Sequence, residues 1–457
     1  MVRGTRRRGG NVNWLACVAA LLLTLLAMAW GPMRQGPAPE GSEFQVNSFT
    51  SYDQYNPSVA MDAKGNFVVA WNSNGQDGNG LGAFAQRFDP AGRPVGAEFR
   101  VSSHTISDQT GARVAMDPDG NFVIVWDDRS GLDGKWWGVF AQRYDSTGAE
   151  LGGAFQVNSY TMSDQTMASV AMDPDGNSVV AWASSFQDGD SWGIFAQRFD
   201  SAGAPVGEEF AVNTFTTDAQ TLPEVAMDAN GDFVIVWMSN NQDGSNTGMF
   251  GRRFGSDGVP SGGEFQVNTY TTSSQYYGSV AMDPEGNFVV SWKSNGQDGY
   301  WHGVFARRYD STGIPLGGEF QVNTYTMYGQ EDPVVAMDNR GNFVVVWDGS
   351  GQGDLDGGVW ARRYDSAGTA LDEDFRVNTY SLIGQERPSV ALHILGDVLV
   401  VVWDSRNQDG DANGVFGQRY GLLPFEIQIA AEAASDAAPN RAAPKDVPPE
   451  GVNGGRD

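Results

Sequence analysis

The chain has 457 residues, of which 59 are glycine, and aromatic residues make up 12% of it. Its formal net charge is −27, which disfavours binding to nucleic acid and to anionic lipid headgroups. Only three histidines occur, so a histidine-rich zinc site is not expected. The single cysteine, Cys17, lies near the start, so no disulfide is expected in the mature chain. The many glycines and aromatic residues favour an all-β protein stabilised by packing.

Both ends of the chain differ from its middle. Residues 1–29 combine an arginine-rich start, an apolar stretch and an Ala-Met-Ala cleavage site, which predicts a cleaved export signal. An uncleaved membrane anchor is the alternative. Residues 30–42 are typical of a linker, and residues 421–457 are rich in Ala, Pro and Asp, which predicts a mostly disordered tail. No second apolar stretch is long enough to span a bilayer, so no membrane span is expected in the mature chain.

The segment 114–145 shows the unit from which the middle is built. Residues 114–116 and 122–126 are short apolar runs on either side of an Asp-Pro-Asp-Gly sequence, which is typical of a tight turn and predicts a β-hairpin. Residues 139–144 predict a third strand and residues 154–157 a fourth. The unit is therefore expected to be a four-stranded antiparallel meander.

This unit occurs seven times between residues 43 and 420, with a spacing of 55 or 56 residues. Its anchor tryptophans are Trp71, Trp126, Trp182, Trp237, Trp292, Trp347 and Trp403. Four strands per repeat of this length predict a seven-bladed β-propeller, and an open β-solenoid is the alternative. The fourth-strand motif first stands alone at residues 43–47, and the last copy lacks a fourth strand. The N-terminal strand is therefore expected to complete the last blade and close the ring.

Polar residues recur in the two long connections of each repeat, which should share one face of the ring. One Gln precedes each inner strand and a second Gln follows six of the tryptophans, usually before Asp-Gly. Hydrogen bonds that tie the loops are one interpretation, and seven equivalent calcium or sugar sites are the other. No cofactor is required by any motif, and calcium is the candidate. Its candidate ligands are Asp77, Asp133, Asp188, Asp243, Asp298 and Asp409.

An arginine recurs in the third strand of every repeat, as Arg143 does in the second. A buried arginine needs a partner, and the Asp that ends the inner strand, such as Asp117, is a candidate. His393 replaces this Asp in the last repeat. The arginines are interpreted as framework.

Residues that break the repeat are better guides to a single site. Exposed aromatic rings beside carboxylates suit stacking on sugar rings or docking of a protein, whereas local packing between loops is the plainer alternative. The candidate ligand-binding residues are Trp136, Trp137, Trp192, Tyr276, Tyr277, Tyr300, Trp301 and His302.

Catalysis is the less favoured hypothesis. Glycoside hydrolysis requires paired carboxylates, and the long loops contain unrepeated acids without a distinctive spacing. These acids are Asp53, Asp127, Asp128, Asp190, Glu331, Asp332, Asp356 and Glu386. The chain contains no G-x-S-x-G elbow, no H-E-x-x-H motif and no P-loop.

The repeat VAMDPxGNFVVxW…QDG…GVFAQRYD…EFQVN resembles a repeat of bacterial exported and surface proteins. The resemblance covers residues 43–420 and implies a propeller outside the cytoplasm, without supplying catalytic residues. The leading hypothesis is a secreted or envelope-associated binding module for a glycan or protein ligand on the long-loop face, with a monomer as the expected state. A calcium-stabilised scaffold and a polysaccharide-active enzyme, either a glycosidase or a lyase, are the alternatives.

Overall fold

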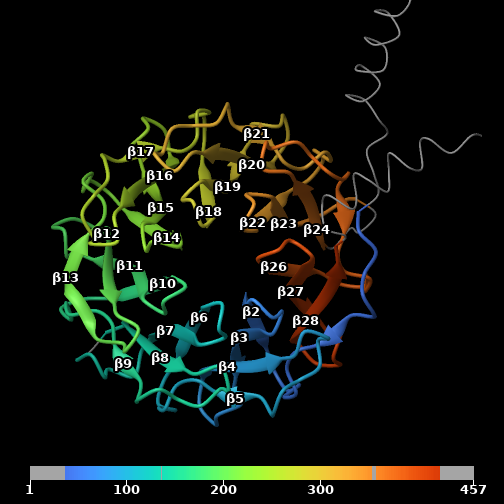
Figure 1. Cartoon of the computed structure of the whole chain (residues 1–457), viewed down its shortest axis with the longest axis horizontal. Coiled ribbons are helices and arrows are strands. Elements are labelled where there is room, and N and C mark those ends of the chain that lie inside the picture. Colours follow the sequence, from blue (N-terminus) through green and yellow to red (C-terminus); the bar gives the residue numbers. More distant parts are fainter. Residues whose placement is uncertain (1–35, 135, 353–356, 423–457) are drawn as a thin grey trace, which may run out of the picture.

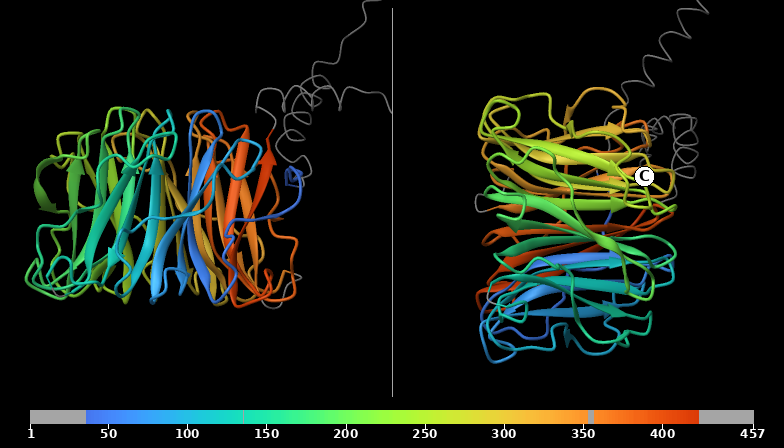
Figure 2. Two further views of the ribbon diagram at one scale, coloured as in Figure 1. Left: turned by 90° about the horizontal axis from the view of Figure 1, so that it is seen from below. Right: turned by 90° about the vertical axis from the view of Figure 1, so that its left-hand side faces the viewer.

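The computed structural model describes residues 36–134, 136–352 and 357–422, and these residues form 28 β-strands and no helix. The strands make seven antiparallel four-stranded sheets, which stand as blades around a central axis (Figure 1). The side views show a flat ring whose thickness is about the length of one strand (Figure 2). This arrangement confirms the predicted seven-bladed β-propeller. The predicted export signal and residues 423–457 of the predicted tail lie outside the described residues.

In six blades the strands follow chain order from the axis outward, and in the last blade β1, the first strand of the chain, is the outer strand. The inner strands are β2 (Gln54–Met61), β6 (Gln109–Met116), β10 (Gln165–Met172), β14 (Gln220–Met227), β18 (Gln275–Met282), β22 (Gln330–Met337) and β26 (Gln385–Leu392). The second strands are β3 (Phe67–Asn74), β7 (Phe122–Asp128), β11 (Ser178–Ser185), β15 (Phe233–Asn240), β19 (Phe288–Asn295), β23 (Phe343–Gly349) and β27 (Val398–Arg406). The third strands are β4 (Leu81–Phe88), β8 (Gly138–Tyr144), β12 (Trp192–Phe199), β16 (Thr247–Phe254), β20 (His302–Tyr309), β24 (Gly358–Tyr364) and β28 (Asn413–Gly421). The outer strands are β5 (Phe99–Arg100), β9 (Phe155–Gln156), β13 (Pro205–Ala211), β17 (Phe265–Gln266), β21 (Phe320–Gln321), β25 (Phe375–Arg376) and β1 (Phe44–Gln45).

The inner strands are longer than the sequence predicts. In the second blade the strand begins at Gln109, which pairs with Asp128, and not at residue 114. A β-bulge interrupts the pairing between Thr110 and Arg113. The polar residues in front of the bulge do not alternate with apolar ones, which is why the first half of the strand was predicted as loop. The repeated Gln therefore starts the inner strand and is fully buried there.

The N-terminal strand closes the ring. β1 pairs with β28 in the last blade, with Phe44 opposite Gly417. Val46 N–H continues the ladder by donating to the carbonyl oxygen of Val415 at 2.8 Å. These contacts confirm the predicted closure. Part of the predicted linker joins the same ladder, because Glu40 N–H donates to the carbonyl oxygen of Arg419 at 2.8 Å.

The hydrophobic core lies between neighbouring blades. The second strand of each sheet is covered on both faces, so its residues form a continuous apolar run. All seven anchor tryptophans are buried, and none exposes more than 2% of its surface. Phe122 stacks on Tyr144 of the same blade with ring centroids 4.7 Å apart, and Phe99 of the preceding blade contacts Tyr144 at 5.3 Å. Aromatic contacts of this kind join each blade to the next.

The repeated arginine has a different partner from the one that the sequence suggested. Asp117 accepts hydrogen bonds from the N–H groups of Asp119 and Asn121 and thereby holds its own turn. Arg87 instead donates from Nη2 to the carbonyl oxygen of Ser146, at 2.8 Å, in a turn of the next blade. The candidate pairing with Asp was therefore wrong, because the short carboxylate is satisfied locally. The arginine still acts as framework, since it joins adjacent blades.

The junction of the last two blades departs from this pattern. Arg363 forms an ion pair with Asp372 of its own blade, with Nη2 and Oδ1 3.0 Å apart. At the ring closure His393 replaces the turn Asp. Its Nδ1 contacts Asp397, and its Nε2 lies 3.0 Å from the carbonyl oxygen of Ala63 in the first blade.

Candidate functional site

The repeated polar residues of the long-loop face close the loops. Gln165 donates from Nε2 to the carbonyl oxygen of Ser163 at 2.7 Å, and its Oε1 accepts from Asn158 Nδ2 at 3.0 Å. The second Gln, represented by Gln187, donates to Glu209 Oε1 at 2.7 Å. These bonds agree with the structural interpretation of the repeated Gln, although the second Gln bonds to a glutamate of the outer strand and not to the first Gln.

The six candidate calcium ligands lie one to a blade. Asp77 and Asp298 each accept a hydrogen bond at 3.1 Å from the N–H group two residues further on, which fixes the loop. The described residues contain no group of three or more His, Cys, Asp or Glu side chains placed to hold a metal ion. Calcium takes six to eight oxygens, and one carboxylate per loop supplies too few of them. Calcium binding by these loops stays a prediction.

Every inner strand carries the same bulge close to its long-loop end. The second residue after each Gln has a left-handed backbone, with φ between 44° and 65°. These residues are Asn56, Gly111, Met167, Leu222, Tyr277, Asp332 and Arg387. Six of the seven are not glycine, so the backbone there is strained. Because the inner strands surround the axis (Figure 1), the bulges form a ring around the axis on the long-loop face.

The residue after each anchor tryptophan lies opposite the bulge of the next blade. Asp127 accepts from the N–H groups of Met167 at 2.8 Å and Ala168 at 3.3 Å. Asp404 accepts from Asn56 N–H at 3.3 Å across the ring closure. We call this position the slot. Its seven residues are Asn72, Asp127, Ala183, Met238, Lys293, Asp348 and Asp404.

Lys293 is the only cation in the slot, and it lies between the fifth and sixth blades. Its side chain is 4% exposed, and its Nζ is 2.9 Å from Glu331 Oε2 and 3.7 Å from Asp332 Oδ1. Nζ also lies 4.6 Å and 4.5 Å from the ring centroids of Tyr276 and Tyr277. Burial lowers the pKa of Lys293, but the two carboxylates outweigh this effect and the pKa is raised. Lys293 is therefore a buried ammonium group held by two acids and two aromatic rings.

A chain of hydrogen bonds runs from Tyr276 through His302 to Glu331. Tyr276 Oη is 2.9 Å from His302 Nε2, and His302 Nδ1 is 3.0 Å from Glu331 Oε1. The hydrogen bond from His302 lowers the pKa of Glu331 to about 2, so the carboxylate is ionised at neutral pH and only accepts. Nδ1 of a neutral His302 therefore carries the proton, and Nε2 accepts from the Tyr276 hydroxyl. We call these residues the blade 5–6 cluster: Tyr276, Tyr277, Lys293, His302, Glu331 and Asp332.

Exposed aromatic rings stand beside this cluster. Trp301 is 66% exposed and Tyr300 is 47% exposed, both on the loop that leads into β20. Tyr300 contacts Tyr328 of the next long loop edge to face, with centroids 6.2 Å apart. The structure thus brings together five of the eight candidate ligand-binding residues: Tyr276, Tyr277, Tyr300, Trp301 and His302.

The other three candidates lie in the second and third blades. Trp136 is half exposed, whereas Trp137 receives the guanidinium of Arg129 5.8 Å from its ring centroid. Trp192 starts β12 and packs against the core between the third and fourth blades. Trp192 is therefore explained by local packing. Trp136 and Trp137 form a separate group.

The slot continues the charged cluster into the sixth and seventh blades. Asp348 lies directly opposite Glu331 across the strand pair. Burial, and then repulsion from Asp332 and Glu331, raises the pKa of Asp348 well above its ordinary value. Asp404 is 3.4 Å from Arg387 Nη1, and burial raises the pKa of Asp404 to about 7.

Lys293, Asp348, Arg387 and Asp404 were missed from the sequence. Lys293 could have been found by comparing the residue after each tryptophan, where it stands among Asn, Asp, Ala and Met. Among the unrepeated acids, the structure places Glu331 and Asp332 in the cluster. Asp356 lies outside the described residues.

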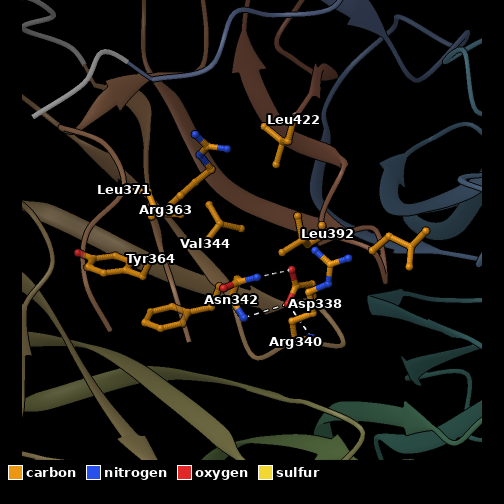
Figure 3. Close-up of a pocket in the computed structure, with 12 residues that line it drawn as sticks. Asp338, Arg340, Asn342, Val344, Arg363, Tyr364, Leu371, Leu392 and Leu422 are labelled. Atoms are coloured by element: carbon orange, nitrogen blue, oxygen red, sulfur yellow. Dashed lines mark hydrogen bonds between the residues drawn. The ribbon is translucent and has the colours of Figure 1, made fainter. Parts of the chain in front are cut away.

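A cavity lies on the short-turn face between the sixth and seventh blades (Figure 3). Leu371, Leu392 and Leu422 line it together with the buried Arg363. Asp338 faces Asn342 there and bonds to it, with Oδ2 and Nδ2 2.9 Å apart. The cavity is mostly apolar and belongs to the framework.

The sequence matches no protein-family model and no curated protein. Among solved structures, a polysaccharide lyase of family PL25, an ulvan lyase, is similar with a TM-score of 0.52 and 10% identity over 84% of this chain and 96% of that one. A protein of unknown function from Dyadobacter fermentans gives a TM-score of 0.48 and 11% identity over 86% and 100%. An α-L-arabinanase of Penicillium chrysogenum gives 0.44 and 11% over 82% and 98%. The likeness to the ulvan lyase agrees with the propeller fold, and the resemblance to the exported repeat proteins stays an expectation.

Proposed function

We propose that the protein is an exported glycan-binding propeller whose site is the blade 5–6 cluster with the adjoining rings of Tyr300 and Trp301. The observation that carries the proposal is the unrepeated combination of exposed aromatic rings with a connected polar chain. Sugar rings bind proteins by stacking their apolar faces on aromatic side chains while their hydroxyls bond to fixed polar groups. Tyr277 and Trp301 supply such faces, and Glu331 supplies an ionised acceptor.

The charge of the site selects among glycans. Glu331 is ionised and partly exposed, Asp332 stands beside it, and the whole chain carries a net charge of −27. A uronate or a sulfated sugar would meet like charge, which disfavours binding. Neutral sugars offer hydroxyl donors that carboxylates accept. The ligand class that fits is therefore a neutral polysaccharide.

The likeness to the solved ulvan lyase extends to the fold, and the ligand class is inferred from the blade 5–6 cluster alone. Binding of a protein partner is the competing outcome, since exposed Trp and Tyr side chains also anchor protein interfaces.

A panel of neutral and anionic polysaccharides tests the proposal by affinity electrophoresis and calorimetry. Neutral glycans should bind, and Trp301→Ala should raise Kd roughly 10-fold through the loss of one stacking contact. Trp136→Ala is the matched control, because it removes an equally large exposed ring from another blade. Failure of every neutral glycan to bind, or equal losses in both variants, would contradict the proposal.

A further inference from the structure

We propose that the blade 5–6 cluster also hydrolyses glycosidic bonds, with Tyr276 as the nucleophile, His302 as its base and Asp332 as the general acid. This inference rests on the proposed glycan binding at the same site. Glycan binding alone does not require Tyr276, His302 and Glu331 to be linked by hydrogen bonds. The inference gives that chain a role in a reaction.

The geometry is that of a nucleophile, a base and an orienting group in series. The Tyr276 hydroxyl donates to His302 Nε2 over 2.9 Å, and His302 Nδ1 donates to Glu331 Oε1 over 3.0 Å. A weak hydroxyl nucleophile becomes reactive when an adjacent base receives its proton and a third group holds that base. Glu331 fixes the ring orientation and stabilises the imidazolium that forms. Burial raises the pKa of Tyr276, so the phenol needs this base in order to react.

Asp332 supplies the proton for the leaving group. Its Oδ1 and the Tyr276 ring lie 3.7 Å and 4.6 Å from the same Lys293 Nζ, so both groups belong to one site. Burial raises the pKa of Asp332, whereas the hydrogen bond from His302 lowers that of its neighbour Glu331. Two adjacent carboxyls with pKa values pushed apart can hold opposite protonation states, as acid catalysis requires. The ammonium group of Lys293 contacts both carboxyl groups and holds them in position.

The reaction balances in two steps. In the first, Tyr276 Oη bonds to the anomeric carbon, its proton passes to His302 Nε2, and the glycosidic oxygen leaves with the proton of Asp332. In the second, the carboxylate of Asp332 takes a proton from water, and the water oxygen bonds to the anomeric carbon. Tyr276 Oη departs and regains its proton from His302. The net change is the addition of one water across one glycosidic bond, with retained stereochemistry.

The first blade provides a natural comparison for this site. Tyr55 occupies the position of Tyr276, and the guanidinium of Arg387 lies 5.6 Å from its ring centroid, as the ammonium of Lys293 lies near Tyr276. However, Leu81 occupies the position of His302, so no histidine pairs with this tyrosine from that position. The repeat thus places a tyrosine at this position twice and a histidine beside it once.

Hydrolysis of neutral polysaccharides and aryl glycosides by the full chain tests the inference. Tyr276→Phe should reduce turnover at least about 1,000-fold and His302→Gln about 100- to 10,000-fold, whereas Tyr55→Phe should keep full activity. Asp332→Asn should lose activity on polysaccharide more than on aryl glycosides whose leaving group needs no proton. A slow substrate should leave a sugar adduct on Tyr276, detected by mass spectrometry.

Binding is measured on the same samples by calorimetry, so that the two proposals can fail separately. Glycan binding without turnover, or full activity in Tyr276→Phe, would overturn the catalytic inference and leave the binding proposal intact. Absence of both binding and turnover would overturn both.

Discussion

Two pairs of adjacent blades use the slot in different ways. Between the second and third blades, the slot residue Asp127 bonds to the backbone N–H groups of Met167 and Ala168. Between the fifth and sixth blades, the slot residue Lys293 bonds to the side chains of Glu331 and Asp332. Both slot residues are buried and hold the same place in the strand register. One serves the backbone and the other assembles a cluster.

Proline accounts for part of the variation in the slot. Ala168 has an N–H group that needs an acceptor, whereas Pro333 occupies the equivalent position in the sixth blade and has none. The fourth blade has Pro223 there, and the slot residue of the third blade that faces it is Ala183. Proline alone does not decide the slot residue, because Asp404 faces Pro57 and still accepts from Asn56 N–H at 3.3 Å. The repeat therefore sets the fold, and departures from it at single positions such as Lys293 assemble the cluster.

Lys293→Met should have the largest effect on this comparison. The change copies Met238, the slot residue of the fourth blade, and leaves Glu331 and Asp332 without their cation. Removing one partner of a buried ion pair costs about 3–4 kcal/mol, and binding of neutral glycans should be lost as the cluster separates. Urea unfolding at pH 7 measures the stability.

The control is the same substitution combined with Glu331→Gln and Asp332→Asn. Because no carboxylate is then left without its cation, the cost of Lys293→Met should fall by more than half. An unchanged cost would show that Lys293 stabilises by packing alone.

Asp127→Asn should have a smaller effect of opposite sign. Burial raises the pKa of Asp127 to about 7, and the two backbone N–H donors only partly oppose this. A carboxyl with a raised folded-state pKa stabilises the fold below its unfolded pKa of about 4 and loses that contribution as the pH rises through 7. Asn keeps an acceptor for Met167 and Ala168 without the charge, as Asn72 does in the first blade.

The variant should therefore be more stable than the wild type by about 2 kcal/mol at pH 8. The difference should shrink to near zero at pH 4, where both side chains are neutral. Thermal unfolding at the two pH values measures it. A variant that is less stable at pH 8 would show that the charge of Asp127 contributes favourably to the seam.

Much of the architecture could be predicted from the sequence because it is repeated. The spacing of Trp126 and its equivalents indicates seven blades, and the isolated motif at residues 43–47 indicates the closure, which β1 makes with β28. The first half of each inner strand could not be predicted, since its bulge breaks the alternation. The partner of Arg87 was also missed, because a carbonyl oxygen of the next blade leaves no signal in the sequence.

The site could be predicted only in part. Tyr276, Tyr277 and His302 were found because they break the repeat, and Glu331 was noted among the unrepeated acids. Their connection depends on Lys293, which reaches across to a blade that begins some 40 residues later, so sequence order gave no indication of it. Trp136 is separated from this group because it lies in the second blade. Its distance from the fifth blade depends on the order of blades around the propeller.

Trp136→Ala should have the smallest effect and tests whether the function belongs to one seam. Trp136 is half exposed, so its loss should change the free energy of unfolding by less than about 0.5 kcal/mol. It should also leave glycan affinity unchanged, whereas Trp301→Ala, which is equally neutral for folding, should weaken binding. If Trp136→Ala reduces affinity as much as Trp301→Ala does, the ligand spans the long-loop face from the second blade to the fifth. The contrast between the two seams would then describe two ends of one extended site, with Asp127 and Lys293 on opposite sides of the propeller axis.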